Sequence, residues 1–166
     1  MVYMKIICFH NPEEENGYLS NWYPSPFQLD GKEFVSSEQY MMYRKAICFK
    51  DEEIAEKILA TSDPRQIKAL GREVHGYIDS VWAAKREEAV YEGLLAKFSE
   101  NPELKKRLLD TKDATLAECA VNDRIWGIGL SMKDPDRLDK GKWRGKSLLG
   151  ETLMRVRECL SKEEAK

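Results

Sequence analysis

The sequence lacks the clustered ligands that metal centres and redox motifs require. Its 166 residues contain 2 histidines and 4 cysteines. The cysteines lie far apart, with no C-x-x-C pair and no nearby pair of histidines, whereas zinc and redox motifs need closely spaced ligands. Reduced, partly buried thiols are therefore expected at all four positions: Cys8, Cys48, Cys119 and Cys159.

Long apolar runs and an excess of one charge are also missing. No segment approaches the ~20 apolar residues of a membrane span. The N-terminal stretch Met1–Phe9 has too short an apolar run, and no small-residue cleavage site, for a signal peptide. The 27 basic and 29 acidic residues leave a net charge of -2, so no overall positive field attracts nucleic acid or membranes. We expect a cytoplasmic protein without a membrane partner.

No repeat, low-complexity stretch or linker divides the chain, so residues 1–166 are predicted to form a single domain. The first third is β-like. Ile6–Phe9 indicates a strand, and Phe27–Phe34 reads as a hairpin that turns at Asp-Gly. Between them, Asn21–Pro26 is expected to be a loop, because its two prolines remove backbone donors and fix φ.

Helix signals dominate after the hairpin. Ser36 or Ser37 is predicted to cap a helix that runs to about Phe49, and Asp51 is predicted to cap the next. Asp63 and Asn101 are each predicted to cap a helix that begins at the following proline, and these helices end at Gly71, a natural stop, and near Leu109. Two further helices are expected, one from Ser80 through Phe98 and one from about Ser147. The last carries an apolar stripe of Leu149, Leu153, Val156 and Leu160. The segment Thr111–Gly141 is expected to be irregular. The predicted fold class is therefore α+β, predominantly helical, with a small N-terminal β element.

Glu38 and Lys45 are the first candidate reactive residues. At 100° per residue they lie two turns apart on nearly the same face of their helix, with Met41 and Met42 between them. A carboxylate and an amine on a semi-apolar face can tune each other's pKa for acid-base or nucleophilic chemistry. The alternative is a solvated helix with charges at ordinary spacing.

A second candidate lies in the loop from Asn122 to Gly129. Trp126 stands beside two nearby glycines, which suggests a tight loop where an indole can stack on a flat base. Asp123 could bind a ribose hydroxyl or stabilise positive charge at an anomeric carbon. The alternative is a tryptophan that fills the core and an aspartate that forms a turn.

A third candidate is the basic turn Gly141–Ser147. Its glycines are one residue too close for a phosphate loop, and no apolar strand precedes them. A helix N-terminus flanked by Lys142, Arg144 and Lys146 is still a plausible site for a phosphate or diphosphate. The alternative is a solvated basic turn.

A series of landmarks runs along nearly the whole chain: Leu19–Phe27, Ser37–Tyr40 with Lys45, Asp63–Pro64, Gly71–Arg72, Trp82, Lys97–Phe98, Leu109, Thr111, Glu118, Asp123, Trp126–Gly129, Leu149–Gly150, Leu153–Met154 and Arg157. In this order they resemble the NADAR, or YbiA-like, family of N-glycosidases. The resemblance implies hydrolysis of N-glycosidic bonds in one of two substrate types. These are phosphoribosylamino-pyrimidine intermediates of riboflavin synthesis and ADP-ribose attached to guanine, so an ADP-ribosylated nucleic acid is one candidate substrate.

The resemblance also implies that Glu38, Lys45, Asp123 and Trp126 belong to the pocket. Further substrate contacts are expected among the matching landmarks and the basic turn: Ser20, Asn21, Arg72, Trp82, Glu118, Gly127, Lys146 and Ser147. Three positions depart from the family pattern. Gln39 stands where histidine is common, Ser147 where asparagine is common, and Val90 where methionine is common.

The expected chemistry needs no metal or redox cofactor. Lys45 would attack or polarise C1 of the ribose while Glu38 moves protons. Asp123 would hold ribose hydroxyls, Trp126 would stack on the base, and Arg72 or the basic turn would take phosphate. The alternatives are a non-catalytic module that binds NAD or ADP-ribose and a purely structural helical domain.

Overall fold

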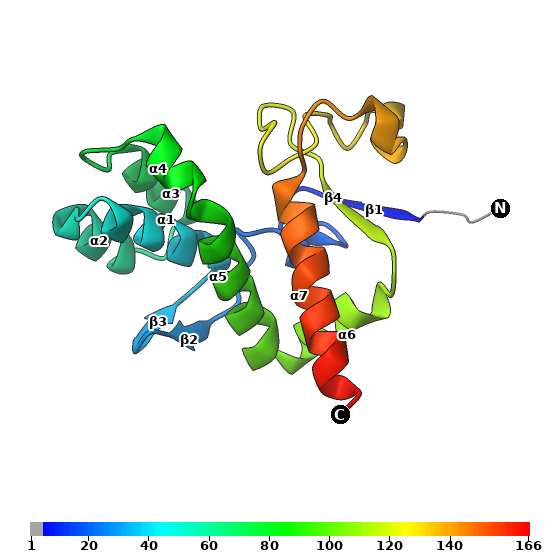
Figure 1. Cartoon of the computed structure of the whole chain (residues 1–166), viewed down its shortest axis with the longest axis horizontal. Helices are drawn as coiled ribbons and strands as arrows, with labels where there is room; N and C mark the ends of the chain where they lie inside the picture. The colour runs from blue at the N-terminus through cyan, green and yellow to red at the C-terminus, as the bar shows by residue number, and fades with distance from the viewer. Residues whose placement is uncertain (1–4) are drawn as a thin grey trace. The chain divides into compact units, whose positions relative to one another are not determined.

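Helices make up most of the chain, and the predicted α+β class is confirmed. The computed structural model describes residues 5–166, so Met1–Met4 of the N-terminal stretch lie outside the described residues. Across that range, seven α-helices accompany four short strands (Figure 1). The chain divides into two compact units. The first unit is Met1–Tyr23 with Pro102–Lys166, and the second is Pro24–Asn101.

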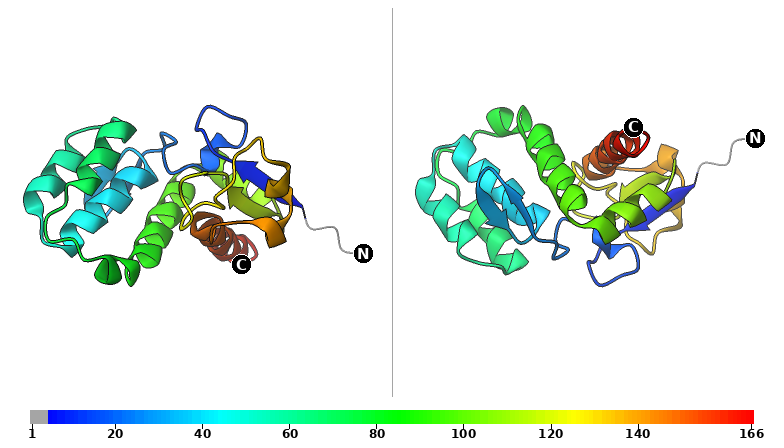
Figure 2. Two further views of the ribbon diagram at one scale, coloured as in Figure 1. Left: turned by 90° about the horizontal axis from the view of Figure 1, so that it is seen from above. Right: turned by 90° about the horizontal axis from the view of Figure 1, so that it is seen from below.

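The first unit is built on a parallel pair of strands, β1 (Ile6–Phe9) and β4 (Thr115–Glu118). The long helix α7 (Leu148–Glu164) packs on β4, and α6 (Pro102–Asp110) packs on α7 (Figure 2). The predicted apolar stripe of α7 is almost fully buried. A Cβ on Gly150 would lie 1.9 Å from the carbonyl oxygen of Leu116, so only glycine lets α7 approach β4 this closely.

The strand β4 was missed by the sequence analysis, which assigned its segment to irregular structure. Thr115, Leu116 and Ala117 are all buried, so the strand shows no alternation of apolar and polar residues. Its hydrogen-bonded partner, β1, lies near the N-terminus, more than a hundred residues earlier in the sequence. Such a short strand owes its existence to pairing with a distant segment, which local patterns do not reveal. The predicted strand β1 itself is confirmed.

The second unit surrounds helix α1 (Ser37–Cys48), which contacts α2 (Glu52–Leu59), α3 (Pro64–Arg72) and α5 (Arg86–Glu100). The predicted hairpin is present as β2 (Phe27–Leu29) and β3 (Lys32–Phe34). Its turn residues have positive φ, 54° at Asp30 and 74° at Gly31, as a tight Asp-Gly hairpin turn requires. Two hairpin rings, Phe27 and Phe34, pack against the ring of Tyr40. The caps predicted at Ser36, Asp51 and Asp63 are all confirmed.

The helix predicted from Ser80 through Phe98 is wrong in one respect. It is two helices, α4 (Asp79–Ala83) and α5, separated at Ala84 and Lys85. Lys85 has φ -118°, which interrupts the helical path. Trp82 of α4 is buried, and α5 has a buried face of its own. The prediction was therefore right that both pieces are helical, but it missed the break between them.

Gly71 does not end its helix, contrary to the prediction. It is buried inside α3, which continues to Arg72. A Cβ at Gly71 would lie 2.1 Å from the Sδ atom of Met42 on α1. The glycine therefore serves the close approach of α3 to α1.

The four cysteines are free, as predicted. Cys8 and Cys119 are buried, and Cys48 and Cys159 are partly buried. Within residues 5–166, no helix combines the length and the apolar character needed to cross a membrane.

Candidate functional site

Helix α1 carries both Glu38 and Lys45, which confirms their predicted placement on one helix. The helix begins where the Ser36 hydroxyl accepts a hydrogen bond from the Gln39 amide, at 3.2 Å. Glu38 is 8% exposed and Lys45 is partly buried. The predicted semi-apolar stripe is also present, because Met41 and Met42 are both buried.

The surroundings of Lys45 lower the pKa of its amine. Burial is the main cause, the charge of Arg72 adds to it, and the charge of Glu38 opposes it. Lys45 Nζ lies 4.6 Å from the centroid of the Tyr77 ring, a distance at which the ring face attracts an ammonium group. Glu38, the predicted partner of Lys45, and Arg72, a predicted phosphate contact, are thus both near enough to shift the pKa of Lys45.

Tyr77 was not singled out from the sequence, although it contacts the candidate nucleophile. Its ring packs against Phe49 with centroids 5.4 Å apart, and its hydroxyl donates to Asp79 at 2.8 Å. It follows Gly76 in the connection between α3 and α4, where no periodic pattern marks a residue as facing the site. Its contact with Lys45 depends on the path of that connection, which only the folded chain shows.

Gln39 has a structural role in this chain. Its side-chain oxygen accepts from the Val35 amide at 2.8 Å, and its Nε2 donates to the carbonyl oxygens of Ile58 and Thr61, both at 3.0 Å. The two Nε2 bonds tie the start of α1 to the end of α2, and the bond from Val35 fixes the residue that precedes the helix cap. A neutral imidazole has one donor and one acceptor, so histidine could not make all three.

Trp82 is 5% exposed on α4. Such burial fits an indole that packs in the core better than the predicted role of Trp82 as a substrate contact. Arg72, by contrast, is exposed at the end of α3, where its guanidinium can meet a phosphate.

In the first unit, Asp123 organises the loop that carries Trp126. Its Oδ1 atom accepts from the backbone amides of Ile125 at 3.0 Å and Trp126 at 2.8 Å. Asp123 therefore forms a turn, as the alternative interpretation predicted, and the turn uses one of its two carboxylate oxygens. Asp123 and Trp126 are both partly exposed, so the second oxygen and part of the indole remain within reach of a ligand.

The loop is joined to the start of α7 by backbone hydrogen bonds. The amides of Ser147, Leu148 and Leu149 donate to the carbonyl oxygens of residues 127, 125 and 126, at 3.1, 3.0 and 3.2 Å. A Cβ on Gly127 would lie 2.8 Å from the carbonyl oxygen of Asp123, so this junction requires glycine. Because these three amides are occupied, a phosphate bound here would be contacted by side chains.

Ser147 holds a backbone conformation that serine seldom adopts, with φ 52° and ψ 44°. The residue is 1% exposed, and its Oγ has no hydrogen-bond partner among the described residues. Asparagine and glycine tolerate this left-handed region better. The departure from the family's asparagine therefore leaves a strained residue with an unsatisfied hydroxyl.

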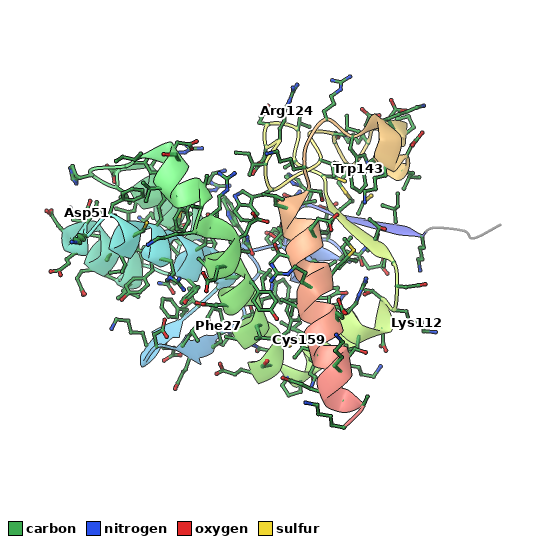
Figure 3. The ribbon with its side chains drawn as sticks, viewed as in Figure 1. Phe27, Asp51, Lys112, Arg124, Trp143 and Cys159 are labelled. Atoms are coloured by element: carbon green, nitrogen blue, oxygen red, sulfur yellow. The ribbon has the colours of Figure 1, made fainter. Side chains whose placement is uncertain are left out.

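The cations of the basic turn are exposed at Arg144 and Lys146, and Arg124 of the opposite loop is exposed as well (Figure 3). The two segments run side by side, because the amide of Lys146 donates to the carbonyl oxygen of Arg124 at 2.9 Å. The amide of Arg144 donates to the carbonyl oxygen of Ile128 at 2.8 Å. The structure thus adds Arg124 to the predicted basic turn.

The other predicted contacts of this unit are Ser20, Asn21 and Glu118. Ser20 Oγ accepts from the Trp22 amide at 3.1 Å, and Asn21 is 8% exposed. Glu118 is the last residue of β4, and its carbonyl oxygen accepts from the Ile128 amide at 2.8 Å. Its partly buried position at a strand end suits a side chain that faces a ligand.

The predicted residues thus form two groups. Glu38, Lys45 and Arg72 are neighbours in the second unit, and Asp123, Trp126, Gly127 and Ser147 are neighbours in the first. A pocket shared by Lys45 and Trp126 stays a prediction.

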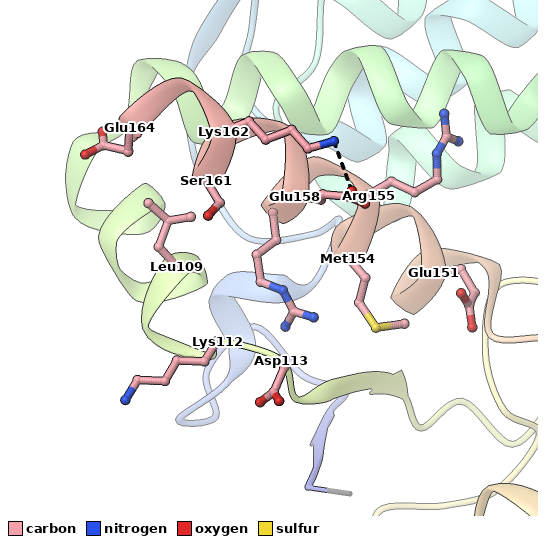
Figure 4. A pocket seen from close by; sticks show the side chains of 11 residues that line it. Leu109, Lys112, Asp113, Glu151, Met154, Arg155, Glu158, Ser161, Lys162 and Glu164 are labelled. Atoms are coloured by element: carbon pink, nitrogen blue, oxygen red, sulfur yellow. Dashed lines mark ion pairs between the residues drawn. The ribbon is translucent and has the colours of Figure 1, made fainter. Parts of the chain in front are cut away.

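A separate pocket of about 910 Å³ lies along α7 in the first unit (Figure 4). None of the predicted catalytic or substrate-binding residues lines it, although the family landmarks Leu109, Met154 and Arg157 do. Its walls carry both signs of charge, including the ion pair of Lys162 with Glu158 at 3.1 Å. Balanced charges of this kind give no preference for a phosphorylated ligand. The candidate site therefore rests on the two groups of residues above.

Comparison with known proteins places the chain in a family. The NADAR domain profile matches residues 8–161, and the protein belongs to the NADAR domain family. Among similar proteins, an N-glycosidase of Acanthamoeba polyphaga mimivirus is 41% identical over 162 residues, which cover 93% of this chain and 95% of that protein. The N-glycosidase YbiA of Escherichia coli strain K12 is 33% identical over 159 residues, covering 96% of this chain and 91% of YbiA.

A solved structure agrees with this assignment. The NMR structure of the E. coli protein YbiA superposes with a TM-score of 0.81 at 32% identity, covering 99% of this chain and 90% of that one. A riboflavin biosynthesis protein of Vibrio vulnificus is 34% identical over 154 residues, which are 93% of this chain but 38% of that larger protein.

Proposed function

We propose that this protein is an N-glycosidase that hydrolyses the bond between a nitrogen base and ribose phosphate or ADP-ribose. The names of the mimivirus and E. coli relatives support the reaction class. The observation that carries the proposal is the partly buried Lys45, whose pKa is lowered, on the same helix as the buried Glu38. A carboxylate and an amine that can lose its proton supply both parts of the required chemistry.

Breaking the bond develops positive charge at C1 of the ribose and negative charge on the departing base. A carboxylate near C1 stabilises the positive charge, and an acid near the base neutralises the negative one. In the proposed mechanism Glu38 supplies the proton to the base. Asp123 faces C1 or the ribose hydroxyls through the oxygen that its turn leaves available.

Lys45 is proposed to act covalently. A ribosylamine opens to an imine, and the neutral amine of Lys45 can replace the base amine at C1 to give a Schiff base. Water then attacks C1, the C–N bond to Lys45 breaks, and the amine is regenerated. Because burial lowers the pKa of Lys45, more of the nucleophilic form is present near neutral pH than for an exposed lysine.

Binding roles follow from the surroundings of the remaining residues. Trp126 is proposed to stack on the base, and Arg72, Lys146 and Arg124 to meet the phosphate or diphosphate. The single domain predicted over residues 1–166 is part of this proposal. The four free cysteines support a reducing cytoplasm as the setting.

Two substrate classes fit this site. The riboflavin biosynthesis protein among the similar proteins favours a phosphoribosylamino-pyrimidine. The several exposed cations of the basic turn and Arg124 favour ADP-ribose on guanine, free or within a nucleic acid. No metal or redox cofactor enters the proposed steps.

Incubation with each ribosylated compound, followed by mass analysis of the products, tests the proposal. Release of the free base by the wild-type protein is expected, and borohydride added during turnover should attach a sugar to Lys45. Lys45→Arg should bind substrate but release no base, because guanidinium keeps the charge and is not a nucleophile. Lys68→Arg, on the exposed surface of α3, is the matched control. Binding of ADP-ribose without release of any base would instead identify a non-catalytic binding module.

A further inference from the structure

The side of α7 opposite its buried apolar stripe carries four charged residues. At 100° per residue they fall within about 60° of one another and face away from the apolar stripe. All four are exposed and line the pocket of about 910 Å³ (Figure 4). They are spaced four, three and four residues apart, the spacing of residues on one face of a helix. This charged stripe of α7 consists of Glu151, Arg155, Glu158 and Lys162.

The order of charges along the charged stripe complements itself. Arg155 follows Glu151 by four residues, and Glu158 precedes Lys162 by four. A second copy of α7 that runs antiparallel therefore places its Lys162 opposite Glu151. The same arrangement places Arg155 of each copy opposite Glu158 of the other. Each contact occurs twice, as in any two-fold interface, whereas a parallel copy in the same register would set every charge against an identical one.

Contacts within one copy leave the carboxylates of the stripe available to a second copy. Lys162 Nζ lies 3.1 Å from Glu158, and Lys140 Nζ lies 3.7 Å from Glu151. The side chains of both pairs are half exposed or more, and exposed pairs of this kind contribute little stability. A carboxylate also has room for several donors. Each glutamate can therefore accept a second cation without losing a strong contact.

The pocket beside the stripe gives side chains of a second helix a place to enter. Its other wall is formed by the end of α6 and the turn that follows, at Leu109, Lys112 and Asp113. Met154 of α7 and Leu109 add apolar surface to it. The 17 residues of α7 span about 25 Å, so a pair of these helices covers less area than a standard protein interface. A weak dimer is therefore expected.

We propose that two copies of this chain associate through their charged stripes, with the two α7 helices antiparallel about a two-fold axis. The partner is a second copy because the order of charges on the stripe matches its own reverse. None of the residues proposed for catalysis or substrate binding belongs to the charged stripe. Association can therefore be measured whether or not the protein releases a base.

Sedimentation equilibrium of the full chain tests the interface. The wild type should change from monomer to dimer between micromolar and millimolar concentration. Raising the ionic strength from about 0.1 M to about 1 M shortens the Debye length from ~10 Å to ~3 Å, so the dissociation constant should rise. A wild type that stays monomeric at millimolar concentration would overturn the proposal, and so would a dimer that high salt strengthens.

Charge reversal tests the antiparallel register. Arg155→Glu and Glu158→Arg should each raise the dissociation constant roughly tenfold or more, because two attractive contacts become two repulsive ones. An equimolar mixture of the two variants should form a heterodimer, since each reversed residue then faces an opposite charge. The double variant Arg155→Glu/Glu158→Arg should recover a homodimer for the same reason. A mixture and a double variant that both stay monomeric would exclude this register.

Lys32→Glu is the matched control for Arg155→Glu. It reverses one exposed positive charge on β3 in the second unit, so it changes the net charge equally and should leave association unchanged. Circular dichroism should show equal helix content in all variants. Equal weakening by Lys32→Glu and Arg155→Glu would assign the effect to net charge and overturn the proposed interface.

Discussion

The ring of Tyr77 is predicted to hold Lys45 in its protonated form against the effects of burial and Arg72. The Nζ atom lies 4.6 Å from the ring centroid, and Tyr77 is 42% exposed. At such exposed sites a cation–π contact contributes about 0.5–1 kcal/mol. Tyr77→Leu removes the ring face while keeping apolar bulk, so burial of Lys45 should change little.

Loss of this contact destabilises the ammonium form alone and therefore lowers the pKa of Lys45 further. The ratio of neutral amine to ammonium near pH 7 should rise roughly twofold to fivefold, the factor that corresponds to the contact energy. If imine formation limits the reaction, borohydride trapping at Lys45 should accelerate by the same factor.

The pKa can be measured without turnover, from the pH dependence of Lys45 acylation followed by peptide mass analysis. Tyr77→Phe is the matched control, because it keeps the ring and loses only the hydroxyl that donates to Asp79. The wild type and Tyr77→Phe should agree, with Tyr77→Leu shifted to lower pH. Identical curves for all three proteins, or an upward shift in Tyr77→Leu, would refute the reasoning.

Three further predictions address the loop, the left-handed serine and a buried lysine. Asp123→Asn should keep the turn through its amide oxygen but lower kcat. Asp123→Ala should lower kcat and also destabilise the loop by about 1 kcal/mol. Equal melting temperatures for the two variants would contradict this. Ser147→Ala should raise the unfolding free energy by about 1 kcal/mol, because it removes an unsatisfied buried hydroxyl, and urea denaturation showing a loss would argue for a hidden partner. Burial lowers the pKa of Lys97 from its usual value of 10.5 to about 7. Between these two values the unfolded chain binds more protons than the folded one, so the free energy of unfolding should rise with pH across that window. Lys97→Met should therefore stabilise the protein most below pH 7, and a constant difference in urea midpoint from about pH 6 to about pH 9 would exclude this titration.

Local sequence signals predicted most helix starts and the hairpin, because caps and turns depend on neighbouring residues. Ser36, Asp51 and Asp63 cap their helices as expected, and Asp30-Gly31 makes the expected turn. Strand β4 escaped prediction because its pairing with β1 is set by a distant segment. The break between α4 and α5 escaped because no glycine or proline marks it: residues 83–86 are Ala-Ala-Lys-Arg, all good helix formers.

In the candidate site, too, local features could be predicted from the sequence and tertiary contacts could not. Glu38 and Lys45 could be placed on one helix from spacing alone, and Asp123 could be foreseen as turn-forming. The contact of Tyr77 with Lys45 depends on tertiary packing, so no sequence pattern pointed to it. Gly71 was wrongly predicted to end its helix, because glycine is suited both to helix C-termini and to the close packing of two helices.

The hydrogen bonds between the Trp126 loop and α7 have a consequence for how substrate preference can evolve. The carbonyl oxygens of Ile125, Trp126 and Gly127 hold the first amides of the helix, and these main-chain bonds do not depend on the side chains at the first two positions. Mutations that exchange the side chain at position 126, or its exposed neighbour Ile125, can therefore accumulate without loss of the loop's path. Under the proposed stacking role of Trp126, a NADAR domain built in this way can acquire a preference for a new base while its scaffold remains intact.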